Sequence, residues 1–84
     1  MDSLSRRIRD IIAVELQVDG EKVTPEARLR QDLGMDSVAA LNILFAAEET
    51  FGIAAIDVAE LAAVSTVRDV ESLLRQHVSL HPAT

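Results

Sequence analysis

Apolar side chains recur with the spacing of an α-helix in separate segments of this 84-residue chain. In the first segment, about residues 3–17, they stand at Leu4, Ile8, Ile11, Ile12 and Leu16. This spacing places them on one face of a helix. Further helices are predicted over about residues 37–50, 57–63 and 66–77. We therefore predict an all-α fold: a four-helix bundle with a long loop between helices one and two and a short third helix.

The composition supports a single small helical domain over residues 1–84. A chain of this length has room for one hydrophobic core. Its only aromatic residues are Phe45 and Phe51, so the core must be built from Leu, Ile, Val and Ala. These residues suit a helical bundle. Residues 79–84 are predicted to be a flexible tail.

Residues that favour helix ends frame the predicted helices. Asp36 and Asp57 can accept hydrogen bonds from the first free backbone N–H groups of helices two and three. The segment Thr66-Val67-Arg68-Asp69 has the spacing of a capping box, with Asp in place of the usual Glu. Gly20 and Gly52 lie just beyond the first and second helices and are predicted to end them.

The long connection, about residues 18–36, is predicted to have structure of its own. Thr24-Pro25-Glu26-Ala27 has an N-cap residue followed by proline, which favours one short turn. Val23, Leu29 and Leu33 are expected to anchor the connection to the core.

The net charge of −6 lies entirely in the centre of the chain. Residues 1–30 and 68–84 each contain equal numbers of acidic and basic residues. The central residues 31–67 contain no Lys or Arg, and their acids are Asp32, Asp36, Glu48, Glu49, Asp57 and Glu60. This charge argues against nucleic-acid binding and would attract basic partners. A solvated face that maintains solubility explains the pattern equally well.

Residues that the chain lacks disfavour several kinds of site. Without cysteine there is no disulfide, thiolate metal site or cysteine nucleophile. His77 and His81 are too few for a zinc site and are expected to be exposed. The sequence shows neither a signal-type apolar segment nor the roughly 18 apolar residues needed to span a bilayer. We expect a cytoplasmic protein without a membrane span.

Ser37 is the candidate functional residue, at the predicted junction between the long loop and the second helix. A serine in the first turn of a helix lies at the positive end of the helix dipole, where backbone N–H groups stabilise an anion such as a phosphoryl group. Gly34 lets the chain turn sharply just before it. From these residues alone, a structural interpretation is favoured, in which Asp36 is a helix cap and Gly34 a turn residue.

The predicted second helix is apolar around most of its circumference. Its large apolar residues are Val38, Leu41, Ile43, Leu44, Phe45 and Phe51. A small bundle cannot easily hide so wide an apolar surface. We therefore expect part of this helix to face a partner or line a cavity.

The run Asp32-Leu33-Gly34-Met35-Asp36-Ser37-Val38 resembles the D-L-G-x-D-S-L signature of acyl carrier proteins, and the similarity extends over about residues 3–78. The resemblance reverses the structural interpretation of Ser37. It implies that a phosphopantetheinyl transferase uses coenzyme A and Mg²⁺ to attach 4′-phosphopantetheine to Ser37, with Asp36 and Gly34 supporting the motif. Acyl groups would then be held on the terminal thiol as thioesters. The fold would be of the acyl-carrier type, and the protein would not be an enzyme.

The resemblance also implies a partner surface and a monomeric state. The expected partners are the transferase, an acyl-loading ligase or transferase, and synthase enzymes with basic docking patches. The expected partner-binding residues are Val38, Leu41, Phe45, Glu48, Glu49, Asp57 and Glu60.

Departures from the family pattern indicate a specialised carrier for fatty-acid, lipid or polyketide biosynthesis. Val38 replaces the usual leucine, and Ala39 and Asn42 stand where general fatty-acid carriers tend to have acids. Ala47 occupies a position usually filled by a large aliphatic residue. We hypothesise that Ala47 opens space for acyl cargo, unless Phe45 or another neighbour fills the gap.

Other functions stay open. An aminoacyl or peptidyl carrier of a nonribosomal pathway would use the same arm, but the acidic centre and the Asp-Ser motif favour an acyl carrier. An unmodified helical interaction module would use the apolar belt of the second helix. A small hydrolase with Ser37 as nucleophile would lack an obvious base.

Overall fold

A computed structural model describes residues 3–53 and 56–79, and within these ranges the chain forms four α-helices and one short 3-10 helix. They are α1 (Ser3–Leu16), η1 (Gly20–Lys22), α2 (Ser37–Phe51), α3 (Val58–Ala63) and α4 (Val67–Ser79). Instead of a strand, the described part has one isolated bridge, between Arg28 and Thr66. The predicted all-α fold with a short third helix is confirmed. Of the predicted tail, residues 80–84 lie outside the described residues.

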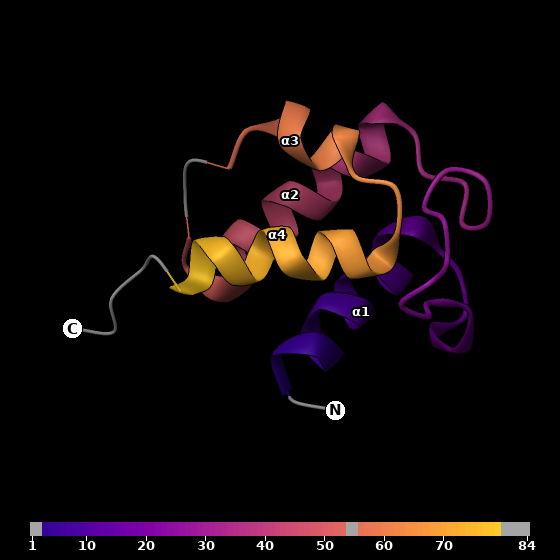
Figure 1. The fold of residues 1–84 in the computed structure, drawn as a ribbon, viewed down its shortest axis with the longest axis horizontal. Coiled ribbons are helices and arrows are strands. Elements are labelled where there is room, and N and C mark those ends of the chain that lie inside the picture. Colours follow the sequence, from indigo (N-terminus) through magenta and orange to yellow (C-terminus); the bar gives the residue numbers. More distant parts are fainter. Residues whose placement is uncertain (1–2, 54–55, 80–84) are drawn as a thin grey trace.

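Helix α2 is the central element of the bundle. It packs against α1 on one side and against α3 on the other, while α4 packs against α1. In Figure 1, α3 lies along the top of the molecule, α1 along the bottom, and the long loop closes the right-hand end. The core is aliphatic, as predicted. Its largest fully buried side chains are Ile8, Ile12, Val23, Leu29, Ile43, Leu61, Val67, Val70 and Leu74.

The loop between α1 and α2 contributes to the core. Val23, Leu29 and Leu33 are buried, as expected, and Met35 is buried with them. The backbone N–H of Leu29 donates to the carbonyl of Ser65 at 2.9 Å, and that of Val67 donates to Ala27 at 3.0 Å. These contacts attach the loop to the start of α4, so the residues that precede α2 are held in place.

The predicted helix caps are present at α3 and α4. Asp57 Oδ1 accepts from the backbone N–H of Ala59 at 2.9 Å at the start of α3. At α4, the N–H of Asp69 donates to Thr66 Oγ1 at 3.3 Å, and the N–H of Thr66 donates to Asp69 Oδ2 at 3.1 Å. This reciprocal pair is the capping box.

The start of the loop, just after α1, differs from expectation. Gly20 does not end α1. Instead α1 ends at Leu16, and Gln17 takes the left-handed conformation with φ of 57°. The N–H of Val18 then donates to Ala13 at 3.0 Å, and Gly20 begins η1, which was not predicted. The short turn predicted at Thr24–Ala27 is present, with the N–H of Ala27 donating to the carbonyl of Thr24 at 3.0 Å.

Asp69 is predicted to make the stability of the protein depend on pH in acid. Backbone hydrogen bonds from Thr66 and then Ser65 hold the pKa of its carboxyl below the ordinary value of 3.8. Because the folded-state pKa is depressed, the stabilisation is present above about 3.8 and is lost as the pH falls through the folded-state pKa. Thermal unfolding followed by circular dichroism should show a smaller loss of Tm below pH 3.8 in Asp69→Asn than in the wild type.

Some acid dependence should remain in that variant, because a backbone hydrogen bond from Arg28 lowers the pKa of Asp32 in the same direction. Equal losses of Tm in the wild type and in Asp69→Asn would contradict the assignment to Asp69.

Two ion pairs of different burial allow a second prediction. Arg9 Nε of α1 lies 3.2 Å from Glu71 Oε1 of α4, and their side chains are 21% and 13% exposed. Arg9→Met leaves Glu71 partly buried without its partner, so we expect a loss of about 1–2 kcal/mol in the free energy of unfolding. The control is Arg68→Met, since the Arg68–Glu26 pair is 65% and 73% exposed and should contribute less than about 0.5 kcal/mol. Urea denaturation measures both, and equal losses would contradict the prediction.

Candidate functional site

Ser37 is the first residue of α2 and is exposed. The helix begins here because Asp36 is in an extended conformation and its Oδ1 accepts from the backbone N–H of Ala39 at 2.8 Å. The carbonyl of Asp36 also accepts from the N–H of Ala40 at 2.9 Å. The predicted cap is therefore confirmed. It places Ser37 in the first turn of a 15-residue helix.

The approach to Ser37 is anchored on both sides of Gly34. Leu33 and Met35 are buried, and the N–H of Met35 donates to the carbonyl of Leu29 at 2.8 Å. Gly34 between them has a φ of +74°, a left-handed conformation in which residues with a Cβ are strained. The turn at Gly34 thus leads the chain from the core to the surface just before Ser37.

His77 is the one histidine in the part of the chain that the structure describes. His77 of α4 lies beside α3, with its Nε2 3.9 Å from Glu60 Oε2. The prediction that His77 is exposed is wrong, since its side chain is only 21% exposed; His81 lies outside the described residues. Within residues 3–53 and 56–79, there is no cluster of three His, Cys, Asp or Glu residues that could hold a metal ion.

The outer side of α2 is apolar next to Ser37. Val38 is 67% exposed, Leu41 38% and Phe45 56%. The opposite side of the helix is buried through Ala40, Ile43, Leu44 and Ala47. The expectation that α2 cannot hide all of its apolar surface is confirmed. Phe45 is exposed and Ala47 is fully buried, so Phe45 is not the neighbour that packs over Ala47 in the core.

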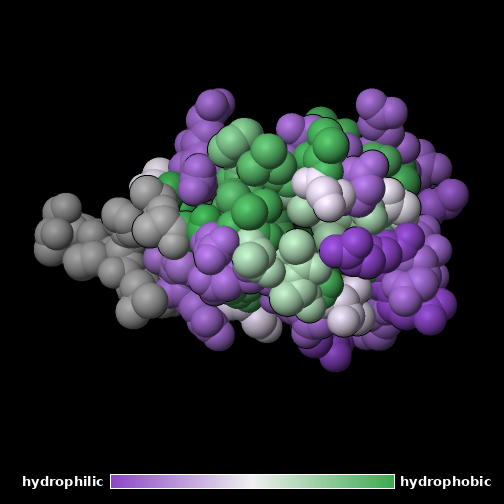
Figure 2. All heavy atoms as spheres, turned by 90° about the horizontal axis from the view of Figure 1, so that it is seen from above, coloured by the Kyte–Doolittle hydropathy of each residue, from purple (hydrophilic) through white to green (hydrophobic). Residues whose placement is uncertain are grey.

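The structure adds Val58 of α3 to this exposed apolar surface, with 39% exposure. Sequence analysis missed Val58, although a six-residue helix with Leu61 as its one buried residue has little room to hide a second large side chain. Figure 2 views the molecule from the α3 side and shows hydrophobic residues gathered at the centre of this face, with hydrophilic residues around them. We call Val38, Leu41, Phe45 and Val58 the outer apolar face.

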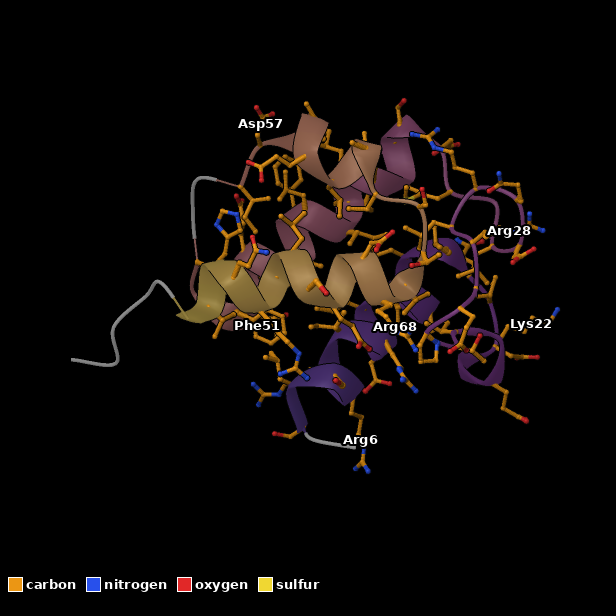
Figure 3. All side chains as sticks on the ribbon, viewed as in Figure 1. Arg6, Lys22, Arg28, Phe51, Asp57 and Arg68 are labelled. Atoms are coloured by element: carbon orange, nitrogen blue, oxygen red, sulfur yellow. The ribbon has the colours of Figure 1, made fainter. Side chains whose placement is uncertain are left out.

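The predicted acidic partner residues lie farther along α2 and on α3. Glu48 is half-buried and Glu49 is exposed, both near the end of α2. Asp57 stands at the start of α3, at the top of the molecule in Figure 3, where it caps the helix. Glu60 is 51% exposed beside His77. The structure therefore brings the apolar candidates close to Ser37 and places the α2 acids at the far end of the helix.

Basic side chains from the loop reach the acidic central segment. Arg28, labelled in Figure 3, donates its backbone N–H to Asp32 Oδ2 at 2.8 Å, and its guanidinium lies 3.3 Å from Oδ1. Arg30 donates to the carbonyl of Ala62, in the last turn of α3, at 2.9 Å. The expected field of a single sign around residues 31–67 is therefore weakened in space, because these partners come from outside that segment.

Comparisons with known proteins show the family of the chain. The family described as the phosphopantetheine attachment site matches residues 6–74. The acyl carrier protein of Treponema denticola is 37% identical over 75 residues, which are 89% of this chain and 95% of the relative. That of Thermosynechococcus vestitus is 37% identical over 73 residues, covering 87% and 89%. That of Thermotoga maritima is 35% identical over 75 residues, covering 89% and 91%.

The matched region contains all of α2, α3 and the loop that leads to Ser37. Such a carrier domain implies interaction with a phosphopantetheinyl transferase and with synthases. None of the helices in the described part of the chain is long and apolar enough to cross a bilayer. The chain belongs to the acyl carrier protein family, whose members hold acyl groups on a covalently attached phosphopantetheine.

Proposed function

We propose that Ser37 is the attachment residue, and that the chain presents acyl thioesters to other enzymes without catalysing a reaction itself. The observation that supports this most strongly is the exposed hydroxyl of Ser37 at the start of α2, directly after the Asp36 cap. An exposed serine at the anchored junction between the long loop and α2 is accessible to a transferase. The chain has no cysteine, so the sulfur that bears the acyl group must come from the arm.

The attachment chemistry fits this position. Ser37 Oγ would attack the pyrophosphate phosphorus that bears the pantetheine portion of coenzyme A. A new P–O bond forms, the pyrophosphate bond breaks, adenosine 3′,5′-bisphosphate leaves, and a base of the transferase or water accepts the hydroxyl proton. The positive end of the α2 dipole stabilises the resulting phosphodiester by about 0.3–1 kcal/mol. The Asp36 carboxylate opposes this effect, and its hydrogen bond from Ala39 moderates that repulsion.

We predict that Ser37 is the modified residue. Incubation with coenzyme A, Mg²⁺ and a broad phosphopantetheinyl transferase should add one phosphopantetheine to the wild type, as seen in the intact mass. Ser37→Ala should gain nothing. The matched control is Ser72→Ala, which removes an exposed serine of α4 and should be modified like the wild type. Modification of Ser37→Ala would assign the arm to another residue, and an unmodified wild type would favour the interaction module.

We also propose a dedicated role in fatty-acid, lipid or polyketide biosynthesis rather than general fatty-acid synthesis. Ala39 and Asn42 supply no charge to the first turns of α2, where general carriers tend to have acids. Transfer of acyl or aminoacyl groups to the phosphopantetheinylated protein separates this proposal from a peptidyl carrier. Preferred loading with an amino acid would favour the peptidyl carrier.

The small size of Ala47 gives a further prediction. Ala47 is fully buried on the core side of α2. If this small residue leaves room for the acyl chain, Ala47→Leu should expose the thioester and raise its cleavage rate by hydroxylamine. The larger side chain should also cost about 1–3 kcal/mol in the free energy of unfolding. Ala46→Leu, at a half-buried position, is the control. An unchanged cleavage rate in folded Ala47→Leu would contradict a role in shielding cargo.

A further inference from the structure

A phosphodiester on Ser37 adds negative charge to a part of the chain that is already acidic. The exposed carboxylate of Asp36 stands next to Ser37 in the chain, and residues 31–67 contain no Lys or Arg. The dipole of α2 supplies only a partial positive charge at this end of the helix. Two negative charges this close repel one another. A full positive charge within reach of Ser37 would therefore stabilise the modified protein.

Arg28 and Arg30 are the basic residues that precede Ser37 most closely in the chain. Arg28 already has an acidic partner: its guanidinium lies 3.3 Å from Asp32 Oδ1, and its backbone N–H donates to Asp32 Oδ2 at 2.8 Å. Arg30 instead donates from Nη2 to the neutral carbonyl of Ala62 at 2.9 Å. This partner leaves the charge of Arg30 uncompensated. Because a guanidinium has five N–H groups, Arg30 also keeps donors for an anion.

Arg30 lines a hollow between the long loop and the end of α3. Its volume is about 260 Å³, and it is lined by Arg28, Arg30, Gln31 and residues 62–65. Arg28, labelled in Figure 3, marks the loop side of this hollow. The lining residues include two arginines and no acidic residue, although the net charge of the chain is −6. Since a water molecule occupies about 30 Å³ in the liquid, a phosphate group has room to enter.

The backbone of the loop brings Arg30 close to Ser37. The N–H of Met35 donates to the carbonyl of Leu29 at 2.8 Å, so the chain returns here to a point that it has already passed. Arg30 is one residue from this contact and Ser37 is two. With standard backbone dimensions, the Cα atoms of Arg30 and Ser37 are at most about 14 Å apart. The long side chain of Arg30 and a phosphodiester on Ser37 can together span this distance.

We propose that this hollow is an oxyanion site in which Arg30 binds the phosphodiester of the arm on Ser37. The inference rests on the attachment at Ser37 proposed above and adds a residue that stabilises the attached group. Arginine suits this role because its planar N–H groups match two oxygens of a phosphate. The hydrogen bond to Ala62 holds the guanidinium at the hollow before the arm is attached.

The test compares urea denaturation of the protein with and without the arm, in the wild type and in Arg30→Met. Attachment of the arm should lower the unfolding equilibrium constant about two- to fivefold more in the wild type than in the variant. Loss of the hydrogen bond to Ala62 affects the variant both with and without the arm, so it cancels in this comparison. Intact mass confirms that each sample carries the arm.

Two matched variants and a change of salt serve as controls. Arg30→Lys keeps the positive charge and should retain part of the effect. Arg68→Met removes an exposed arginine that pairs with Glu26 and does not line the hollow, so it should retain the whole effect. The Debye length falls from about 10 Å at 0.1 M salt to about 3 Å at 1 M, so the effect should shrink over this range.

A second measurement needs no variant and decides the matter if Arg30→Met does not fold. In a nitrogen–proton correlation NMR spectrum, the Nε–H signal of Arg30 should shift when the arm is attached, and its exchange with water should slow. The same spectrum of the apo protein with inorganic phosphate tests whether the hollow binds a free phosphate.

Three outcomes would overturn the proposal. The first is an equal effect of the arm in the wild type and in folded Arg30→Met, and the second is an Arg30 signal that the arm leaves unchanged. Either result, with modification at Ser37, leaves the carrier role intact. A response of Arg30 to inorganic phosphate but not to the arm would make the hollow a site for free anions. If no phosphopantetheine is attached to Ser37, the proposed function fails, and this inference fails with it.

Discussion

The hydrogen bond from the Ala39 N–H to Asp36 Oδ1, 2.8 Å long, determines where α2 begins, and the arrangement of the site depends on that point. Because each later residue turns the helix by about 100°, a start at Ser37 decides which α2 side chains enter the core and which face outward. It places Ala40, Ile43, Leu44 and Ala47 inside and Ser37, Val38 and Phe45 outside. The buried residues Leu33 and Met35 hold the chain before the cap, so the hydroxyl of Ser37 stands at the end of an anchored segment.

Helix α2 thus packs in the core with one side and exposes apolar residues to solvent with the other. Its inner side fills the centre of the bundle between α1 and α3, and its outer side exposes apolar residues beside Ser37. Exposed apolar surface of this kind lowers solubility and is commonly part of a binding site. The carboxylates of α2, Glu48 and Glu49, lie at its far end.

The sequence predicted the elements whose causes are local. Helical spacing and capping residues placed all four α-helices to within two residues at each end, together with the Asp36, Asp57 and Thr66–Asp69 caps. Contacts between residues that are far apart in the sequence were not predictable. Arg30 reaches Ala62, His77 lies beside Glu60, and Val58 joins an apolar surface of α2. The end of α1 was placed to within one residue, but the left-handed conformation of Gln17 was not predicted, because glycine is the usual left-handed residue and Gly20 was near. The attachment role of Ser37 was inferred from resemblance. A serine that follows a helix cap has the same local structure whether or not it carries a phosphopantetheine arm.

The most direct measurement is a phosphorus–proton correlation NMR spectrum of the protein after treatment with coenzyme A and a phosphopantetheinyl transferase. The carrier role predicts one phosphodiester resonance correlated with the β-protons of Ser37. The amide signal of Ala39 should also keep the slow exchange expected for a hydrogen bond to Asp36. A resonance correlated with the β-protons of any other serine, or no phosphodiester resonance, would contradict the assignment of Ser37.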